Sequence, residues 1–195
     1  MQFIISFVVA YLLGSINSAI LVGRVFKNID IREHGSGNAG ATNVLRTLGK
    51  TAALIVLVVD VLKGVISVII GAYLGDFNGS LVAGLGAVIG HNFPVYFSFK
   101  GGKGILTSAG VLFMIDWQVA LIVMVIVIAI MAITRYVSLG SIIGSALYAM
   151  IILVFHWADI WYVTFAICLG GLAIYRHKAN ITRLLNGTES KLGKS

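Results

Sequence analysis

The sequence has little charge, a single proline and a single cysteine among its 195 residues. Charged residues make up 11% of the chain, whereas 59% of the residues are hydrophobic and the mean hydropathy is +1.02. This balance excludes a soluble globular domain of this size, and no alternating barrel-strand pattern accompanies it. The lone cysteine, Cys168, excludes an intrachain disulfide. We therefore expect an all-α integral membrane protein.

Apolar residues are gathered into seven runs. They are roughly Phe3–Val25, Ala52–Leu74, Ser80–Phe93, Gly104–Ile115, Trp117–Ile133, Ser138–Phe155 and Ile160–Tyr175. A helix needs about 20 residues to cross about 30 Å of hydrocarbon, and the third, fourth and seventh runs are shorter than that. Each short run ends in a polar stretch, which must extend the helix or enter a polar pocket recessed into the membrane. We predict one domain, 1–195, with seven transmembrane helices and short or re-entrant loops.

The basic residues predict the orientation of these helices. Apart from Lys63, every Lys and Arg falls in the first, third or fifth connection or in the tail, where Lys191 and Lys194 lie. The second, fourth and sixth connections carry Asp76, Asp116 and Asp159 without any Lys or Arg. By the positive-inside rule, the N-terminus is outside and the C-terminus is cytoplasmic. The net charge of +7 therefore needs no nucleic-acid partner. The first run lacks a basic start and a cleavage site, so we expect a retained span.

The first cytoplasmic cluster covers residues 35–46 and reads GSGNAGATNVLR. Its Gly and Asn residues let backbone N–H groups converge on an anion. Side-chain donors and one guanidinium complete the candidate site, which comprises Ser36, Gly37, Asn38, Thr42, Asn43 and Arg46. We expect Thr42 or Asn43 to cap a helix that continues through Arg46 into the second span. The alternative is a flexible polar linker.

The second cluster covers residues 90–104. Pro94 ends the third apolar run, and Gly101, Gly102, Lys103 and Gly104 open the fourth. Glycines around one lysine suit phosphate, although the spacing is not that of a P-loop and no strand precedes it. The alternative is a basic turn that contacts lipid headgroups.

The third cluster covers residues 175–189, in which His177, Asn180 and Leu184 share one helical face. The alternative is a basic amphipathic tail that contacts lipid. Ser141, at the start of the sixth apolar run, offers a hydroxyl on the same side of the membrane.

Two charges lie inside the second apolar run, Asp60 and Lys63. Charged residues within a membrane are functional candidates by default. We favour the alternative here, in which the two side chains neutralise each other and hold the helices together.

Together the clusters resemble the bacterial membrane-integral, acyl-phosphate-dependent glycerol-3-phosphate acyltransferases. The resemblance covers nearly the whole chain. It rests on residues 35–43 with Arg46, on Asp60-x-x-Lys63-Gly64, on His91-x-Phe93-Pro94 followed by 101–104, and on His177-x-x-Asn180 with 186–189. It implies a seven-span protein of the bacterial cytoplasmic (inner) membrane, with an active site facing the cytoplasm. The implied reaction moves a fatty acyl group from acyl phosphate to the 1-hydroxyl of glycerol 3-phosphate, giving lysophosphatidate and phosphate.

The resemblance also assigns roles to residues. It makes Ser36, Arg46, Lys103, Ser141, His177 and Asn180 the pocket, and it implies no metal and no other cofactor. We expect a monomer whose partners are its two substrates and membrane lipids. Only His177 titrates near neutral pH among these groups, and either it or the leaving phosphate accepts the proton of the attacking hydroxyl. We favour the phosphate, because a basic pocket keeps the imidazole neutral.

Two other classes of protein remain as alternatives. A phosphate or organophosphate transporter also needs a recessed basic pocket, but the outer loops offer it no basic vestibule, and inverted repeats are not evident. A structural lipid-binding subunit would not need Ser36, His177 and Asn180 in one pocket.

Overall fold

The computed structural model describes residues 1–193, all of whose regular structure is helical. Lys194, one of the basic residues of the tail that predict the orientation, lies outside the described residues together with Ser195. The α-helices are α1 (Gln2–Gly14), α2 (Ser18–Lys27), α3 (Ala41–Leu48), α4 (Lys50–Asn92), α5 (Ile105–Ile115), α6 (Trp117–Thr134), α7 (Val137–Phe155), α8 (Ile160–Arg176) and α9 (Lys178–Leu185). The 3₁₀ helices are η1 (Ile31–Glu33) and η2 (Val95–Phe97). The prediction of an all-α protein is confirmed.

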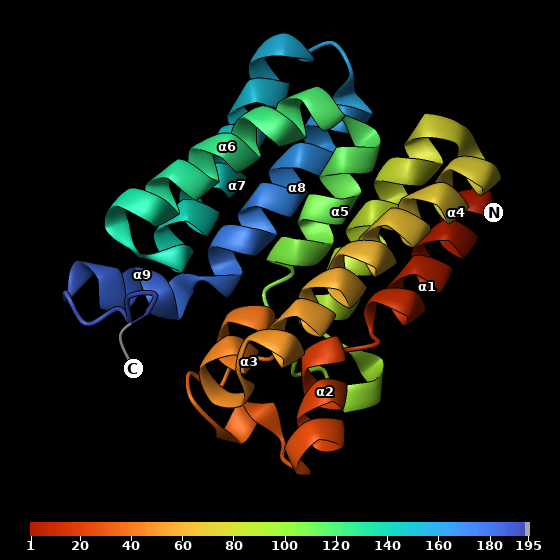
Figure 1. Ribbon diagram of the computed structural model, residues 1–195. Coiled ribbons are helices and arrows are strands. Elements are labelled where there is room, and N and C mark those ends of the chain that lie inside the picture. Colours follow the sequence, from red (N-terminus) through yellow and green to blue (C-terminus); the bar gives the residue numbers. More distant parts are fainter. Residues whose placement is uncertain (194–195) are drawn as a thin grey trace. The chain divides into compact units, whose positions relative to one another are not determined.

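The chain forms two compact units. Unit 1 runs from Met1 to Ile115 and contains α1 to α5, and unit 2 begins at Asp116 and contains α6 to α9. In unit 1, α4 packs against α1 and α5, and α2 and α3 lie at the end away from the N-terminus (Figure 1). In unit 2, α7 packs against α6, α8 and α9.

The first apolar run is not one helix. α1 ends at Gly14 and α2 begins at Ser18, so the predicted span over Phe3–Val25 consists of two helices. Asn17 explains the break, because its side-chain oxygen accepts a hydrogen bond from the Ile20 N–H at 3.1 Å and starts a new helix.

α4 contains the second and third apolar runs, which a sharp turn separates. Gly75 and Asp76 have non-helical backbone angles, and Asp76 has a positive φ of 54°. Gly71 and Gly79 lie so close that a Cβ on either would clash with the carbonyl of the other. α4 is therefore a hairpin of two helical halves, as Figure 1 shows where the yellow ribbon doubles back. The predicted separation of these two runs is confirmed.

Small residues bring the helices of each unit into close contact. In unit 1, the Gly90 backbone lies against the Tyr11 carbonyl of α1, and Gly110 of α5 lies against the Val61 carbonyl. In unit 2, a Cβ on Gly144 of α7 would clash with the side chain of Val127 on α6. Glycine at such positions lets helix backbones approach each other, as is typical of helices that pack in lipid.

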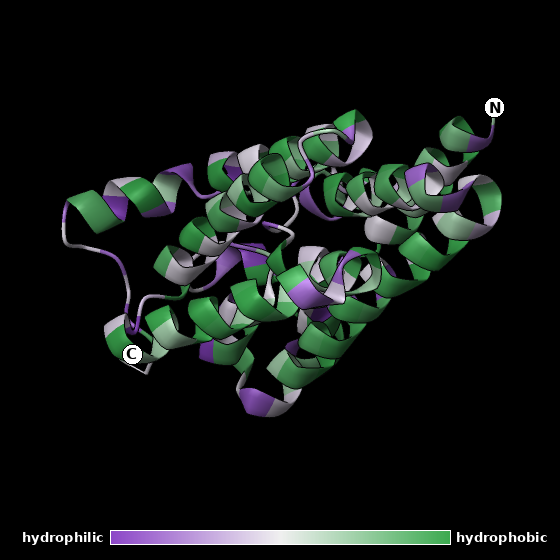
Figure 2. Ribbon diagram, turned by 90° about the horizontal axis from the view of Figure 1, so that it is seen from above, coloured by the Kyte–Doolittle hydropathy of each residue, from purple (hydrophilic) through white to green (hydrophobic). Residues whose placement is uncertain are grey.

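Length and composition identify four membrane-crossing candidates within residues 1–193. They are Gln2–Lys27, Lys50–Phe97, Trp117–Thr134 and Val137–Phe155, and shorter apolar helices occupy Ile105–Ile115 and Ile160–Arg176. Large apolar side chains such as those of Ile4, Leu62 and Val125 are exposed on these helices. Figure 2 shows hydrophobic residues along the helices and hydrophilic residues mainly at the connections. An apolar helix surface of this kind suits lipid and not water.

Candidate functional site

The loop of the first cluster is held together by the amide of Asn43. Asn43 is buried, and its Oδ1 accepts a hydrogen bond from the Ser36 N–H at 2.8 Å. Its Nδ2 donates to the carbonyls of Ile31, at 3.0 Å, and His34, at 2.9 Å. These three hydrogen bonds hold the conformation of the loop between η1 and α3. Ser36 is exposed in that loop.

Two glycines let this loop form. Gly35 and Gly37 have φ values of +60° and +72°, which favour glycine over residues with a Cβ. A Cβ on Gly35 would also clash with Asn43 Oδ1. Glycine is therefore needed at Gly35 for both backbone angle and space, which a flexible linker would not require.

The helix that follows differs from the expectation. Its N-cap is Gly40, without a side-chain cap, so the prediction that Thr42 or Asn43 caps it is wrong. α3 also ends at Leu48 and does not run into the second span, because Gly49 adopts a φ of +89° before α4 begins. Asn43 is not the cap because its amide serves the preceding loop. Arg46 lies in the last turn of α3 with an exposed side chain.

The second cluster has the predicted form. α4 ends at Asn92, Pro94 precedes η2, and α5 begins directly after Gly104. The Gly101 N–H donates to the Asn92 carbonyl and the Gly102 N–H donates to the His91 carbonyl, each at 3.2 Å. These two bonds fold the glycine loop (residues 101–104) back onto the end of α4, with the Lys103 side chain half-buried.

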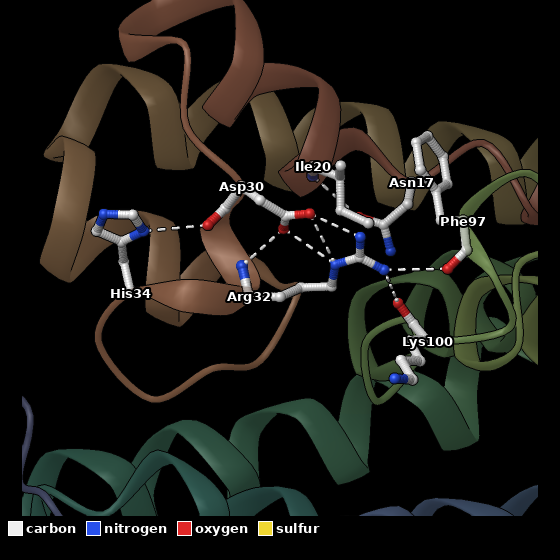
Figure 3. Close-up of polar contacts among 7 residues, drawn as sticks. All are labelled: Asn17, Ile20, Asp30, Arg32, His34, Phe97 and Lys100. Atoms are coloured by element: carbon white, nitrogen blue, oxygen red, sulfur yellow. Dashed lines mark hydrogen bonds and ion pairs between the residues drawn. The ribbon is translucent and has the colours of Figure 1, made fainter.

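Arg32, which the sequence did not single out, connects the segment just before the first cluster to the second cluster. Its guanidinium pairs with the Asp30 carboxylate, with Nη2 at 2.6 Å from Oδ2. Its Nη1 donates to the carbonyls of Phe97, at 3.0 Å, and Lys100, at 3.1 Å (Figure 3). The hydrogen bond from Arg32 lowers the pKa of the Asp30 carboxyl, and the ion pair adds to that effect although burial opposes it. Asp-x-Arg spacing before a glycine cluster was the only sequence signal available.

The first two clusters meet within unit 1. A Cβ on Gly102 would fall against both the His91 ring and the Ala39 carbonyl, so the glycine loop lies on the chain between Asn38 and Gly40. The structure therefore brings Gly102 next to the first loop, which the sequence placed more than 60 residues away.

Asp60 and Lys63 pair as predicted. Lys63 Nζ lies 2.9 Å from Asp60 Oδ1, and both side chains are nearly fully buried. Asp60 Oδ1 also accepts a hydrogen bond from Ser18 Oγ at 2.8 Å. A third side chain, which the sequence did not predict, contacts this ion pair: His91 Nδ1 lies 2.8 Å from Lys63 Nζ.

In unit 2, His177 stands at the junction of α8 and α9. It ends α8 and begins α9, so His177 and Asn180 do not share one unbroken helix. His177 is buried, and its Nδ1 lies 2.7 Å from the Ala173 carbonyl oxygen. A carbonyl only accepts hydrogen bonds, so Nδ1 carries a proton and Nε2 is the acceptor of the neutral ring.

Glu189 orients Asn180, a role that the sequence did not predict. Its Oε1 accepts hydrogen bonds from Asn180 Nδ2, at 2.6 Å, and from Ser138 Oγ, at 2.7 Å. Arg183 Nε donates to Oε2 at 2.7 Å. Burial by itself would raise the pKa of the Glu189 carboxyl, but these three hydrogen bonds outweigh it and lower that pKa. Glu189 thereby connects Asn180 of α9 to Ser138 of α7.

Ser141 lies in the first turns of α7, as the sequence predicted. Its side chain is buried and donates to the Val137 carbonyl of the same helix at 3.0 Å. Such a bond leaves the hydroxyl oxygen able to accept a further hydrogen bond.

Comparisons with known proteins cover the whole chain. A family model described as glycerol-3-phosphate acyltransferase matches residues 4–187. The glycerol-3-phosphate acyltransferase of Thermoanaerobacter sp. (strain X514) is 48% identical over 194 residues, which is 100% of this chain and 98% of the relative. That of Halalkalibacterium halodurans is 45% identical over 191 residues, with 95% of this chain and 93% of the relative covered.

Solved structures agree with these relatives. The crystal structure of PlsY (YgiH), an integral membrane glycerol 3-phosphate acyltransferase, in its glycerol 3-phosphate form, matches with a TM-score of 0.92 and 39% identity. Its lysophosphatidic acid form matches with a TM-score of 0.89 and 38% identity. Each match covers 99% of this chain and 96% of the other. Likeness to an integral membrane enzyme, together with the apolar helices, identifies this chain as a multi-pass membrane protein.

Proposed function

Because the chain belongs to the glycerol-3-phosphate acyltransferase family and is an acyltransferase, we propose that it acylates the 1-hydroxyl of sn-glycerol 3-phosphate with acyl phosphate as donor. The products are 1-acylglycerol 3-phosphate (lysophosphatidate) and phosphate, and the reaction is the first acylation of phospholipid biosynthesis. The observation that carries this proposal is the likeness of nearly the whole chain to a solved acyltransferase described in its glycerol 3-phosphate form. Membership of this family decides against the transporter alternative.

Both proposed substrates carry phosphate, so the site needs cations and N–H donors. We assign phosphate binding to Arg46 and Lys103, with Ser141 assisting. Gly37, Asn38, Gly101 and Gly102 belong to the proposed site because residues without a large side chain admit an anion close to the chain. The N–H groups of Gly37, Gly101 and Gly102 donate to backbone carbonyls in the structure, so the cationic side chains carry most of the proposed phosphate binding. The remaining assigned groups are Thr42 and Asn43, of which Asn43 acts through the loop that it holds.

The donor is acyl phosphate in this proposal. A mixed anhydride already has a good leaving group, so positioning and electrostatic stabilisation supply most of the rate without strong acid catalysis. The attacking hydroxyl oxygen bonds to the acyl carbon, the carbon–oxygen bond to phosphate breaks, and the hydroxyl proton passes to the departing phosphate. Ser36, His177 and Asn180 orient the glycerol. The assignment of His177 is supported by its Nδ1–H bond to Ala173, which leaves Nε2 as a hydrogen-bond acceptor.

We also propose the topology. Counting α1 with α2 as one span, α4 as two and α5 to α8 as one each gives seven spans. The charge pattern supports an outside N-terminus, a cytoplasmic C-terminus and a cytoplasmic active site. The bacterial relatives support placement in the cytoplasmic (inner) membrane. All the assigned side chains come from one chain, and we propose that the monomer is active.

The experiment incubates purified protein with palmitoyl phosphate and labelled glycerol 3-phosphate. We expect labelled lysophosphatidate and an equal amount of released phosphate. Palmitoyl-coenzyme A, supplied free of acyl phosphate, should give no comparable rate. Equal rates with the thioester would exclude acyl phosphate as the specific donor, and no labelled lipid with either donor would overturn the proposed function.

A further inference from the structure

A buried polar network in unit 1 has no role in the chemistry proposed above. Asp60, Lys63 and His91 are 1%, 3% and 3% exposed, and all three lie in α4. Lys63 Nζ contacts both partners, at 2.9 Å from Asp60 Oδ1 and 2.8 Å from His91 Nδ1. Burying charges is costly, and a hydrophobic pair of the same volume often stabilises a protein as well. The network therefore needs an explanation besides stability.

Lys63 and Asp60 form hydrogen bonds with residues at the break between α1 and α2. Lys63 Nζ donates to the carbonyls of Gly14, at 3.2 Å, and Ile16, at 3.1 Å. α1 ends at Gly14, so these carbonyls lie where the helix ladder stops. Asp60 accepts the hydroxyl of Ser18, the first residue of α2. The ion pair thus supplies hydrogen-bond partners to a broken helix in an apolar setting, which such a break requires.

Lys63 also determines the tautomer of His91. An ammonium group has donors only, so when Lys63 is charged Nδ1 of His91, at 2.8 Å from Nζ, is the acceptor. The Asp60 carboxylate oxygen lies farther from the same Nδ1, at 3.6 Å. The proton of the neutral imidazole then lies on Nε2. The ring is therefore held with Nδ1 toward the ion pair and an Nε2–H on its other side.

The other side of His91 faces the glycine loop. A Cβ on Gly102 would clash with His91 Nε2, and a Cβ on Gly101 would clash with the His91 carbonyl oxygen. That same carbonyl accepts the Gly102 N–H at 3.2 Å. His91 is thus the surface on which the backbone of Gly101 and Gly102 lies, one residue before Lys103.

We propose that Asp60, Lys63 and His91 are positioning residues, which fix the glycine loop and through it the placement of Lys103. The network touches no substrate and acts only through the loop backbone. The proposal rests on the proposed function, in which Lys103 binds a substrate phosphate. A loop held in one conformation binds its ligand without an ordering cost, so loosening it weakens binding more than it slows the chemical step.

The test compares two replacements of His91. Asparagine in His91→Asn retains an acceptor near Lys63 but is too short to reach the loop, whereas His91→Gln reaches the Nε2 position with an amide N–H. We expect His91→Asn to raise KM for glycerol 3-phosphate about tenfold and to change kcat less than about threefold. His91→Gln should restore most of the loss. His156→Asn is the matched control, because His156 is exposed and lies in unit 2, and it should leave both constants unchanged.

A spectroscopic measurement does not depend on activity. In protein with ¹⁵N-labelled histidine, the signals that are present in wild type and absent from His91→Gln belong to His91. Their chemical shifts should be those of a protonated Nε2 and an unprotonated Nδ1. A protonated Nδ1 in the wild type would overturn the proposal, even if His91→Asn fails to fold. An unchanged KM for folded His91→Asn would also overturn it. A wild type that makes no lysophosphatidate would refute the proposed function instead, while the tautomer result would still stand.

Discussion

Glu189 Oε1 lies 2.6 Å from Asn180 Nδ2, so a carboxylate near the chain end fixes the amide of the residue that we propose orients glycerol. The same oxygen accepts the hydroxyl of Ser138 at the start of α7. An amide has a donor end and an acceptor end of nearly equal shape, and a carboxylate accepts only the donor end. Glu189 therefore decides which end of the Asn180 amide faces it.

Glu189→Gln should reduce both stability and activity. Glutamine replaces one acceptor oxygen with a donor, so at least one of the hydrogen bonds from Ser138, Asn180 and Arg183 is lost. Hydrogen bonds to charged groups contribute about 1.5–3 kcal/mol, which sets the expected loss in the free energy of unfolding. Glu33→Gln, at an exposed position, is the matched control.

The pH dependence follows from the lowered pKa of Glu189. The unfolded chain binds a proton at the ordinary pKa of 4.5, whereas the folded chain does so only at lower pH. Stability from this group is therefore complete above pH 4.5 and is lost as pH falls through the folded pKa. Between pH 6 and about 3.5, the midpoint temperature of thermal unfolding should fall less in Glu189→Gln than in wild type. Parallel curves would contradict the assignment.

Gly101→Ala should abolish most activity. The new Cβ would clash with the His91 carbonyl, which is backbone and does not rotate away, so the glycine loop must shift. Gly171→Ala is the matched control, because a Cβ on Gly171 in α8 meets no atom within 4 Å. We expect the control to keep its activity and to be no less stable than wild type. Equal activity of the two variants would mean that the loop conformation is not required.

Phosphate recognition should depend on Arg46 and Lys103. Removal of a charge-assisted hydrogen bond to phosphate costs about 1.5–3 kcal/mol, so Arg46→Ala and Lys103→Ala should each lower kcat/KM for glycerol 3-phosphate by roughly 10- to 150-fold. Lys27→Ala removes an exposed cation at the end of α2 and serves as control. Wild-type rates at low glycerol 3-phosphate in both variants would refute the assignment.

His177→Gln distinguishes the two proton acceptors. Glutamine keeps a hydrogen-bond acceptor near the Nε2 position but does not take a proton at neutral pH. If the leaving phosphate accepts the proton, the variant retains partial activity with a pH profile like that of the wild type. General base catalysis contributes about 10²- to 10⁴-fold. Complete loss of activity with substrate binding intact would assign the proton to His177.

Topology is testable by cysteine labelling. The single cysteine, Cys168, is exposed on α8, so the labelling variants are built on Cys168→Ser, which has no native thiol. Cysteines introduced next to Asp76, at the turn of α4, or next to Asp159 should react with an impermeant thiol reagent in intact cells. Cysteines next to Lys100 or Lys191 should react only after the membrane is opened. The reverse pattern would refute the orientation and the cytoplasmic active site.

Much of the fold follows from the sequence alone. The bounds of α6, α7 and α8 match the predicted apolar runs within one residue, because a run of apolar residues in lipid has to satisfy its backbone within a helix. The turn in α4 and the helix end before Pro94 were also predicted, because Asp76 and Pro94 mark the points where apolar runs end. The break at Asn17 was missed, since one asparagine in an apolar run gives a weak signal.

The amino-acid sequence by itself determined the class of protein, the order of the helices and the three polar clusters, because hydropathy and charge act along the chain. Only the tertiary structure decided which polar groups pair across it. The carbonyls of Gly14 and Ile16 receive Lys63, Arg32 reaches the carbonyls of Phe97 and Lys100, and Glu189 receives Asn180. Most of these pairs join residues far apart in sequence, and their geometry depends on how helices approach each other at small residues. No local pattern encodes such distances.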